Sequence, residues 1–212
     1  MFADIHTHNP VQSDYSCIRN LTFVEAGDIF SSTEEGLFSV GIHPWDSETF
    51  LDETLILLKK WAEDSRLVAI GECGLDKNTL AAIDKQAFVF KKQIELSEQV
   101  QKPLIIHCVG CFNQLFEIKK EMNPQQLWII HGFRGKPELA KQALKMGCAL
   151  SFGEHFNAQS VVVTPLDKLF VETDESKMSI EEIYASIARV KNCSPEILSA
   201  GKTLIQQLMT KN

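Results

Sequence analysis

The sequence predicts a (β/α)8 barrel, or TIM barrel, formed by a single domain that spans residues 1–212. Short apolar runs alternate with amphipathic stretches along the chain, and about eight of these runs have the character of buried parallel strands. Polar side chains of the types that bind metals follow several of the runs. In a barrel of parallel strands, the active site is built at that end of the strands.

The expected strands are rich in Val, Ile, Leu or Phe and are bounded by Gly, Pro or charged residues. They cover residues 2–6, 18–24, 37–42, 67–72, 103–107, 127–131, 147–152 and 168–173. A barrel of this type has about 250 residues as a rule, and this chain has 212. Residues 27–33 are too few for a full helix, so we expect the barrel to be irregular and shortened near its second strand. An open doubly wound sheet is the alternative, but its glycine-rich nucleotide turn is absent.

Amphipathic stretches between these runs predict the helices. The longest is expected at 80–101, and Pro103 then ends it and begins a strand. Pro137 and Pro195 lie near the first turns of their helices, where proline is tolerated. The expected helices cover residues 52–64, 80–101, 112–122, 137–146, 179–191 and 195–210.

The composition is that of an ordinary globular protein, with 44% hydrophobic and 23% charged residues. A net charge of −7 argues against a general polyanion-binding surface, although cations bound in a site would reverse the local sign. The first residues lack the pattern of a secretory signal, and no apolar run is long enough to span a bilayer, so we expect a cytoplasmic protein. Cys108 and Cys111 form a Cys-x-x-Cys pair, which alone is weak evidence for a redox or metal role.

Two histidines, His6 and His8, follow the first apolar run. Residues i and i+2 of an extended strand point to the same face, so both imidazoles project into the same space. Two neutral nitrogens placed in this way suit one borderline metal ion. A lone histidine at a strand end is more often structural, but this pair predicts metal ligands.

Four further residues follow later runs in the same manner. His107 and His131 come after similar apolar runs and suggest a pair of nitrogens for a second metal. Glu72 can bridge two cations, because a carboxylate has two oxygens. Asp174 would complete the first metal site and could also accept a proton from the attacking water. Taken singly, each has a structural interpretation; together they predict a dinuclear hydrolase with Glu72 and Asp174 as its catalytic carboxylates.

Two divalent ions about 3.5–4 Å apart can hold the attacking and leaving oxygens of an in-line displacement. Four histidines and two carboxylates form a nitrogen-rich set. Such a set favours Zn, Mn, Co or Fe over a site for Mg alone, which prefers oxygen ligands.

These residues resemble the TatD family of metal-dependent deoxyribonucleases, from Met1 to about Asp174. The motifs, in order, are His-x-His at 6–8, Gly-Ile-His-Pro at 41–44, Gly-Glu-Cys-Gly-Leu-Asp at 71–76, Ile-Ile-His-Cys at 105–108, His-Gly-Phe-x-Gly at 131–135 and Glu-Thr-Asp at 172–174. The resemblance implies a TIM barrel, hydrolysis of phosphodiester bonds in DNA and the same six ligands. It also implies that His43 faces the substrate, which we expect to be single-stranded DNA.

Three positions near the expected substrate depart from the family pattern. Val109 follows Cys108 where the family has arginine, Lys77 replaces an aromatic residue, and the proline that the family usually has two residues after Asp174 is missing. Arg134 could supply a substitute phosphate contact. Two alternatives therefore remain: hydrolysis of an amide, ester or acyl bond in a small molecule, and a binding or scaffold protein without catalysis.

Trp45 follows His43 closely in the sequence and has two interpretations. Its indole could stack on a nucleobase at the rim of the site. It could equally serve as a packed anchor for the loop.

Overall fold

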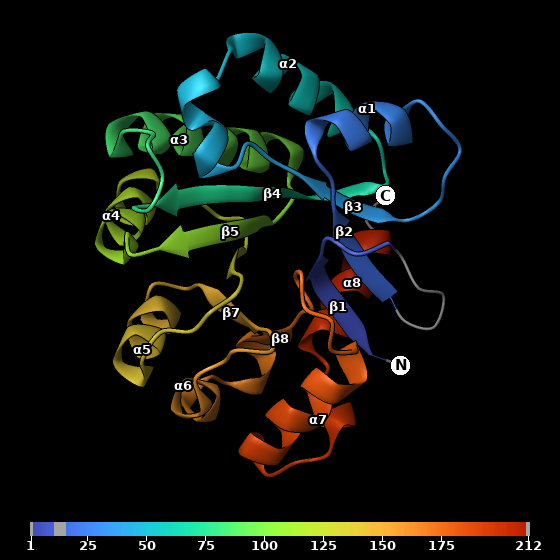
Figure 1. The fold of residues 1–212 in the computed structure, drawn as a ribbon, viewed down its shortest axis with the longest axis vertical. Helices are drawn as coiled ribbons and strands as arrows, with labels where there is room; N and C mark the ends of the chain where they lie inside the picture. The colour runs from blue at the N-terminus through green and yellow to red at the C-terminus, as the bar shows by residue number, and fades with distance from the viewer. Residues whose placement is uncertain (1, 11–15, 211–212) are drawn as a thin grey trace. The chain divides into compact units, whose positions relative to one another are not determined.

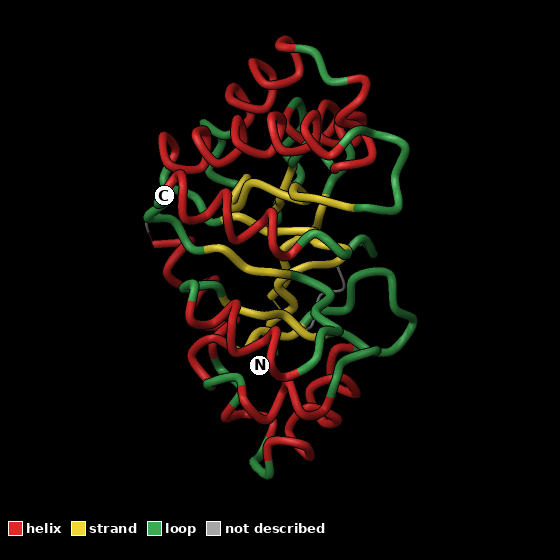
Figure 2. The backbone as a smooth tube through the Cα atoms, turned by 90° about the vertical axis from the view of Figure 1, so that its left-hand side faces the viewer, coloured by secondary structure: helices red, strands yellow, loops and turns green. Residues whose placement is uncertain are grey.

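The computed structural model describes residues 2–10 and 16–210. It has eight parallel strands whose order in the sheet follows the sequence, from β1 to β8, as in a TIM barrel (Figure 1). Figure 2 shows how strands and helices alternate along the chain. The chain divides into two compact units, which we describe one at a time: unit 1 is Met1–Arg19 with Ile129–Asn212, and unit 2 is Asn20–Trp128.

Unit 1 contains the first strands and the last ones. Its strands are β1 (Ala3–Thr7), most of β2 (Ser16–Asn20), most of β6 (Trp128–Ile130), β7 (Ala149–Phe152) and β8 (Leu169–Val171). Its helices are α5 (Pro137–Lys145), α6 (Ala158–Val163), η2 (Leu166–Lys168), α7 (Ile180–Lys191), η3 (Pro195–Ile197) and α8 (Ala200–Thr210). A parallel bridge between Thr7 and Asp174 brings the ends of β1 and β8 together.

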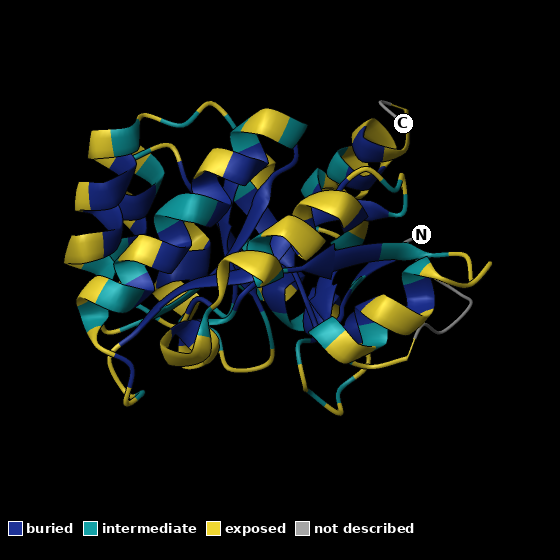
Figure 3. Ribbon diagram, turned by 90° about the horizontal axis from the view of Figure 1, so that it is seen from above, coloured by how far each residue is buried: buried dark blue, intermediate teal, exposed yellow. Residues whose placement is uncertain are grey.

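Unit 2 contains the middle strands β3 (Leu37–Val40), β4 (Leu67–Asp76) and β5 (Leu104–Val109), which pair in that order. Its helices are α1 (Phe23–Phe30), η1 (Pro44–Thr49), α2 (Asp52–Trp61), α3 (Ile83–Val100) and α4 (Phe112–Met122). All ten residues of β4 are buried, which fits a strand with both faces covered. Figure 3 shows the strands in dark blue and the helices with exposed outer faces in yellow.

Short polar signals set the helix ends. Thr22 and Glu25 form a capping box at the start of α1, and Ser179 and Glu182 form another at the start of α7. Asn192 adopts the left-handed conformation that ends α7, as asparagine does more readily than most residues.

The predicted fold class is confirmed, and the elements differ mainly at their ends. The second predicted strand, 18–24, was wrong at its C-terminal end: the strand stops at Asn20, and Thr22 caps a helix that begins at Phe23. Residues 23–30 therefore form a helix of two turns where we expected none. The predicted helix 195–210 is interrupted, because a 3-10 turn at Pro195–Ile197 precedes α8. Across the described residues, no helix has both the length and the apolar character needed to cross a membrane.

Candidate metal centre

In unit 1, His6, His8 and Asp174 form a cluster that we call the β1 group. Each histidine has its Nε2 atom 3.7 Å from Asp174 Oδ1. Backbone hydrogen bonds hold this arrangement: the Asp174 amide donates to the His6 carbonyl at 2.9 Å, and the His8 amide donates to the Asp174 carbonyl at 3.1 Å. Asp174 adopts a left-handed conformation with φ of 55°, which is uncommon for a residue other than glycine. The three side chains can offer one ligand atom each to a single ion.

A buried carboxylate, Asp4, supports the β1 group from within the strand. Its oxygens accept hydrogen bonds from the Thr173 hydroxyl at 2.6 Å, the Thr173 amide at 3.1 Å and the His6 amide at 3.3 Å. Burial raises the pKa of the Asp4 carboxyl to about 7, although the bonds from Thr173 oppose the rise. Asp4 thus ties the strand that carries His6 to the segment that carries Asp174. We did not predict this role, although an aspartate inside an apolar run was its signal.

His131 lies beside the β1 group and has a buried carboxylate of its own. The His6 and His131 rings are 4.4 Å apart between centroids, and His131 Nδ1 is 3.6 Å from Glu172 Oε1. Glu172 is fully buried, and its Oε1 accepts a hydrogen bond from the Gly132 amide. Among the described residues, no hydrogen-bond partner reaches Glu172 Oε2. A buried carboxylate oxygen in this state is costly unless a cation compensates it, so this cluster of donors fits a metal ion.

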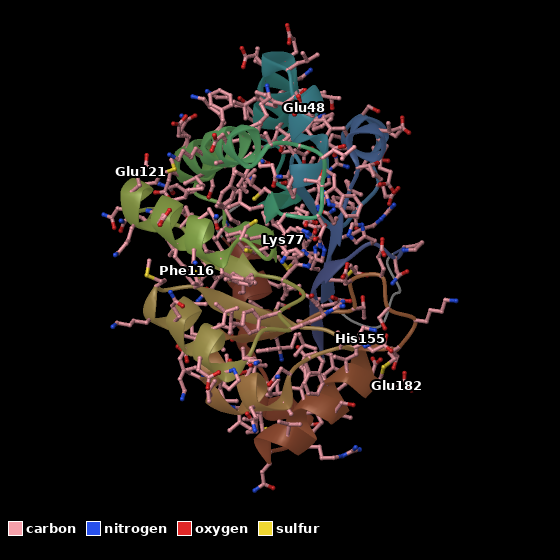
Figure 4. All side chains as sticks on the ribbon, turned by 60° about the vertical axis from the view of Figure 1, so that its left-hand side comes forward. Glu48, Lys77, Phe116, Glu121, His155 and Glu182 are labelled. Carbon is pink, nitrogen blue, oxygen red and sulfur yellow. The ribbon has the colours of Figure 1, made fainter. Side chains whose placement is uncertain are left out.

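A cleft of about 490 Å³ opens beside these residues in unit 1. Its lining includes Glu172, Asp174, Arg134 and His155. Figure 4 labels His155, which follows β7. Arg134, predicted as a phosphate contact, therefore lines the same cleft as Asp174, the predicted proton acceptor.

In unit 2, His43, Glu72 and His107 form a second cluster, which we call the β4 group. His107 Nδ1 lies 2.8 Å from Glu72 Oε1, and His43 Nε2 lies 3.6 Å from the same oxygen. The strand register explains the pairing, because β4 and β5 run side by side with Gly74 opposite His107. The three side chains can offer one ligand atom each to a single ion. His43, predicted to face the substrate, thus lies among ligand-type residues.

Asp76, at the end of β4, contacts the ring nitrogen of His107 that does not face Glu72. Its Oδ2 lies 3.1 Å from His107 Nε2 and accepts a hydrogen bond from Trp45 Nε1 at 2.8 Å. Burial raises the pKa of Asp76, but hydrogen bonds from Asn78, Trp45 and His107 outweigh it, so the pKa lies below its ordinary value. A carboxylate on the second nitrogen of a metal-binding histidine fixes the orientation of its ring. We did not predict this residue, although it closes the quoted motif 71–76.

Two buried glutamines of α3 fix the segments that carry the β4 group. Gln93 accepts a hydrogen bond from the Ile42 amide at 2.7 Å and donates one to the Ile42 carbonyl at 3.0 Å, next to His43. Gln86 makes the same pair of bonds with Asp76, at 2.8 and 3.0 Å. The two glutamines are seven residues apart, so they lie on one face of the helix. Helix prediction from the spacing of apolar residues does not detect buried polar side chains, so these two glutamines were not identified from the sequence.

The Cys-x-x-Cys pair follows His107 in the same unit. Neither cysteine is in a disulfide bond, and Cys111 is buried at the N-cap position of α4. Burial, with a contribution from the charge of Asp76, raises the pKa of the Cys111 thiol. A raised pKa opposes formation of the thiolate, which is the reactive form.

Within each unit, the structure brings several of the predicted residues together. His6, His8, His131 and Asp174 gather in unit 1 with Arg134 nearby, and Glu72, His107 and His43 gather in unit 2. The predicted bridging position of Glu72 between two ions, and the pairing of His131 with His107, stay predictions.

A barrel of parallel strands with histidines and carboxylates at the strand ends is the architecture of metal-dependent barrel hydrolases. The family model described as "TatD related DNase" matches residues 11–203, and the chain belongs to that family. The predicted resemblance is confirmed, and the match extends beyond Asp174 into the C-terminal helices.

Relatives and solved structures agree with this assignment. An "Uncharacterized metal-dependent hydrolase" of Buchnera aphidicola subsp. Baizongia pistaciae is 31% identical over 189 residues, which cover 79% of this chain and 71% of the relative. The "3'-5' ssDNA/RNA exonuclease TatD" of Pantoea sp. is 29% identical over 147 residues, 64% of this chain and 56% of the relative, so the match spans little more than half of that protein. The crystal structure of YJJV, a TatD homolog from Escherichia coli K12, superimposes with a TM-score of 0.83 at 20% identity and covers 99% of this chain and 98% of its own; it shows the fold.

Proposed function

We propose that this chain is a metal-dependent hydrolase that cleaves phosphodiester bonds in single-stranded nucleic acid. The observation that carries the proposal is the presence of two groups of metal-ligand side chains at strand ends, in a chain of the TatD family. The β1 group and the β4 group would each hold one divalent ion, which we expect to be Zn, Mn, Co or Fe, with Mg less favoured by the histidines. The cytoplasmic location predicted from the sequence is kept as part of this proposal.

Divalent ions at such sites lower the pKa of water toward neutrality and stabilise the charge that develops on phosphate oxygens. The chain's own residues supply the remaining steps. Asp174 borders the cleft and has 29% of its side chain exposed, so it can accept the proton of the attacking water. Arg134 lines the same cleft and can bind a phosphate oxygen of the substrate. Asp76 holds the His107 ring in place through its contact with Nε2, and Glu172 lies 3.6 Å from His131 Nδ1.

The small-molecule alternative is less favoured by the comparisons. The Pantoea relative is named as an exonuclease acting on ssDNA and RNA, and so is that of Erwinia tasmaniensis, which is 31% identical over 147 residues. The family model also describes a DNase. We therefore interpret the three departures from the family pattern as altered contacts with the same class of substrate.

Cleavage of single-stranded DNA and RNA by metal-free protein, before and after addition of Mn²⁺ or Mg²⁺, tests the proposal. We expect cleavage only with metal, and a loss of at least about 100-fold in His107→Ala and Asp174→Asn. A panel of amide and ester substrates should remain intact. Turnover of that panel without cleavage of nucleic acid would support the amidohydrolase alternative, and absence of any bound or activating metal would support the scaffold alternative.

A further inference from the structure

The indole of Trp45 is hydrogen-bonded through its N–H, and most of its surface is exposed. It lies in η1, and 64% of its surface is exposed. Its Nε1 donates a hydrogen bond to Asp76 Oδ2 at 2.8 Å, and Asp76 is only 3% exposed. The anchor holds the polar edge of the indole, while most of the apolar ring remains accessible. The other two tryptophans of the chain, Trp61 and Trp128, are buried.

The anchored indole stands directly beside the β4 group. Its ring centroid is 4.8 Å from that of His43 and 6.5 Å from that of His107, in both cases at a steep angle between the ring planes. The oxygen that binds the indole also lies 3.1 Å from His107 Nε2. One buried carboxylate therefore positions both the aromatic surface and a candidate metal ligand, which fixes the distance between them.

We propose that Trp45 is a platform on which one base of a single-stranded nucleic acid stacks, next to the phosphodiester bond that is cleaved. The inference rests on the proposed function and names the substrate contact within it. Every base has an aromatic face, so stacking would hold the chain without selecting its sequence. Because the hydrogen bond to Asp76 already orders the indole, little conformational freedom is lost on binding.

Charge gives a second reason for a contact of this kind. The chain has a net charge of −7, so attraction of a polyanion to its surface is weak outside the metal site. Stacking does not depend on charge and is worth about 1–3 kcal/mol per base, which corresponds to about 5- to 150-fold in affinity. It can therefore supply binding that a surface of net negative charge supplies only weakly.

A comparison of two substrates isolates the stacked base. A single-stranded oligonucleotide and its counterpart with abasic sites around the cleaved bond share the backbone and differ only in the bases. We expect wild-type protein with Mn²⁺ to have a KM about 5- to 150-fold lower for the base-bearing substrate. Trp45→Ala should bring this ratio close to one, whereas Trp45→Phe, which keeps a ring but loses the N–H, should retain most of it. Ile56→Ala, at an exposed apolar residue of α2, should leave the ratio unchanged.

Two results would overturn the inference. An unchanged ratio in Trp45→Ala would show that no base stacks there. If Trp45→Phe and Trp45→Ala lose the same amount of activity on both substrates, and the loss includes kcat, the indole N–H acts by positioning Asp76 and the ring face of Trp45 is not used. If wild-type protein cleaves neither substrate, the proposed function fails, and a binding measurement decides the inference separately. Quenching of tryptophan fluorescence in the wild type by the base-bearing oligonucleotide would support stacking on Trp45, provided that the quenching is absent in Trp45→Phe and with the abasic oligonucleotide. No such quenching would refute it.

Discussion

At the scale of residues, the candidate metal centre depends on buried carboxylates as much as on histidines. Asp76 faces His107, Glu172 faces His131, and Asp4 binds the amide of His6. The six predicted ligands could be read from the sequence because each follows an apolar run. The supporting carboxylates left only local signals, such as an aspartate inside an apolar run, because their role depends on which strand end meets which, and only the fold determines that.

Replacement of Asp76 tests this support directly. Asp76→Asn weakens the acceptor that orients His107, so we expect the affinity for Mn²⁺ or Zn²⁺ to fall by about 10- to 100-fold. Isothermal titration calorimetry of the metal-free protein measures the change. Asp46→Asn, at an exposed residue of η1, is the matched control and should bind metal as the wild type does. Equal affinity in the two variants would refute an orienting role for Asp76.

At the scale of elements, the strands and most helices follow from the sequence, and their ends do not. Apolar runs predicted all eight strands, because a buried parallel strand has few polar positions. The predicted end of β2 was wrong because Phe23 and Val24 continue its apolar run in the sequence. In the structure, the capping box of Thr22 and Glu25 starts α1 at Phe23, so both residues are helical. The hydrogen-bonding glutamines of α3 were missed for a related reason: buried polar residues interrupt an apolar face without any local signal.

Gln93 makes the role of α3 testable. Gln93→Leu removes both hydrogen bonds to Ile42, so the buried backbone amide and carbonyl of Ile42 lose these partners. We expect the free energy of unfolding to fall by about 1–3 kcal/mol, as measured by urea denaturation. Activity should fall as well, because the backbone of Ile42 positions the next residue, His43. Gln99→Leu, at an exposed residue of the same helix, should change neither quantity appreciably. A similar loss in both variants would contradict the role given to Gln93.

The connection between α2 and β4 should contribute a pH-dependent part of the stability. Asp64 accepts three hydrogen bonds from Arg66, which hold the pKa of its carboxyl below the ordinary value of 3.8. The folded state therefore favours the ionised form, and this stabilisation is present above pH 3.8 and is lost as the pH falls through the lower, folded-state pKa. Both side chains are partly exposed, so we expect about 1 kcal/mol.

Urea denaturation of wild type and Asp64→Asn at pH 6 and near pH 3.5 measures this contribution. The difference between their unfolding free energies should be largest at pH 6 and should shrink at the lower pH. Asp28→Asn, at an exposed residue of α1, should show no such change. A difference that grows as the pH falls would contradict the assigned sign.

At the scale of the whole molecule, the C-terminal helix is part of what supports the candidate site. In unit 1, α8 packs against β1, the strand that carries His6. A Cβ atom added at Gly201 would lie 3.1 Å from Ile5 and 3.3 Å from Ala3, so these neighbours would have to shift by a few tenths of an ångström. We expect Gly201→Val to lower the unfolding free energy by about 1–3 kcal/mol in thermal or urea denaturation. Gly27→Val, where an added Cβ meets nothing within 4 Å, should stay within about 0.5 kcal/mol of wild type. Equal stability of the two variants would contradict close packing of α8.

The initial rate of single-stranded DNA cleavage, measured as metal-free protein is titrated with Mn²⁺, shows whether the two groups hold the metals that act in hydrolysis. His8→Ala removes a ligand of the β1 group, and His107→Ala removes one of the β4 group. We predict that wild-type activity is absent without metal and rises until two equivalents are bound. Each variant should lose at least about 100-fold at the same metal concentration. Equal rates in the three proteins, or full activity in the presence of a chelator, would show that the two groups do not hold catalytic metals.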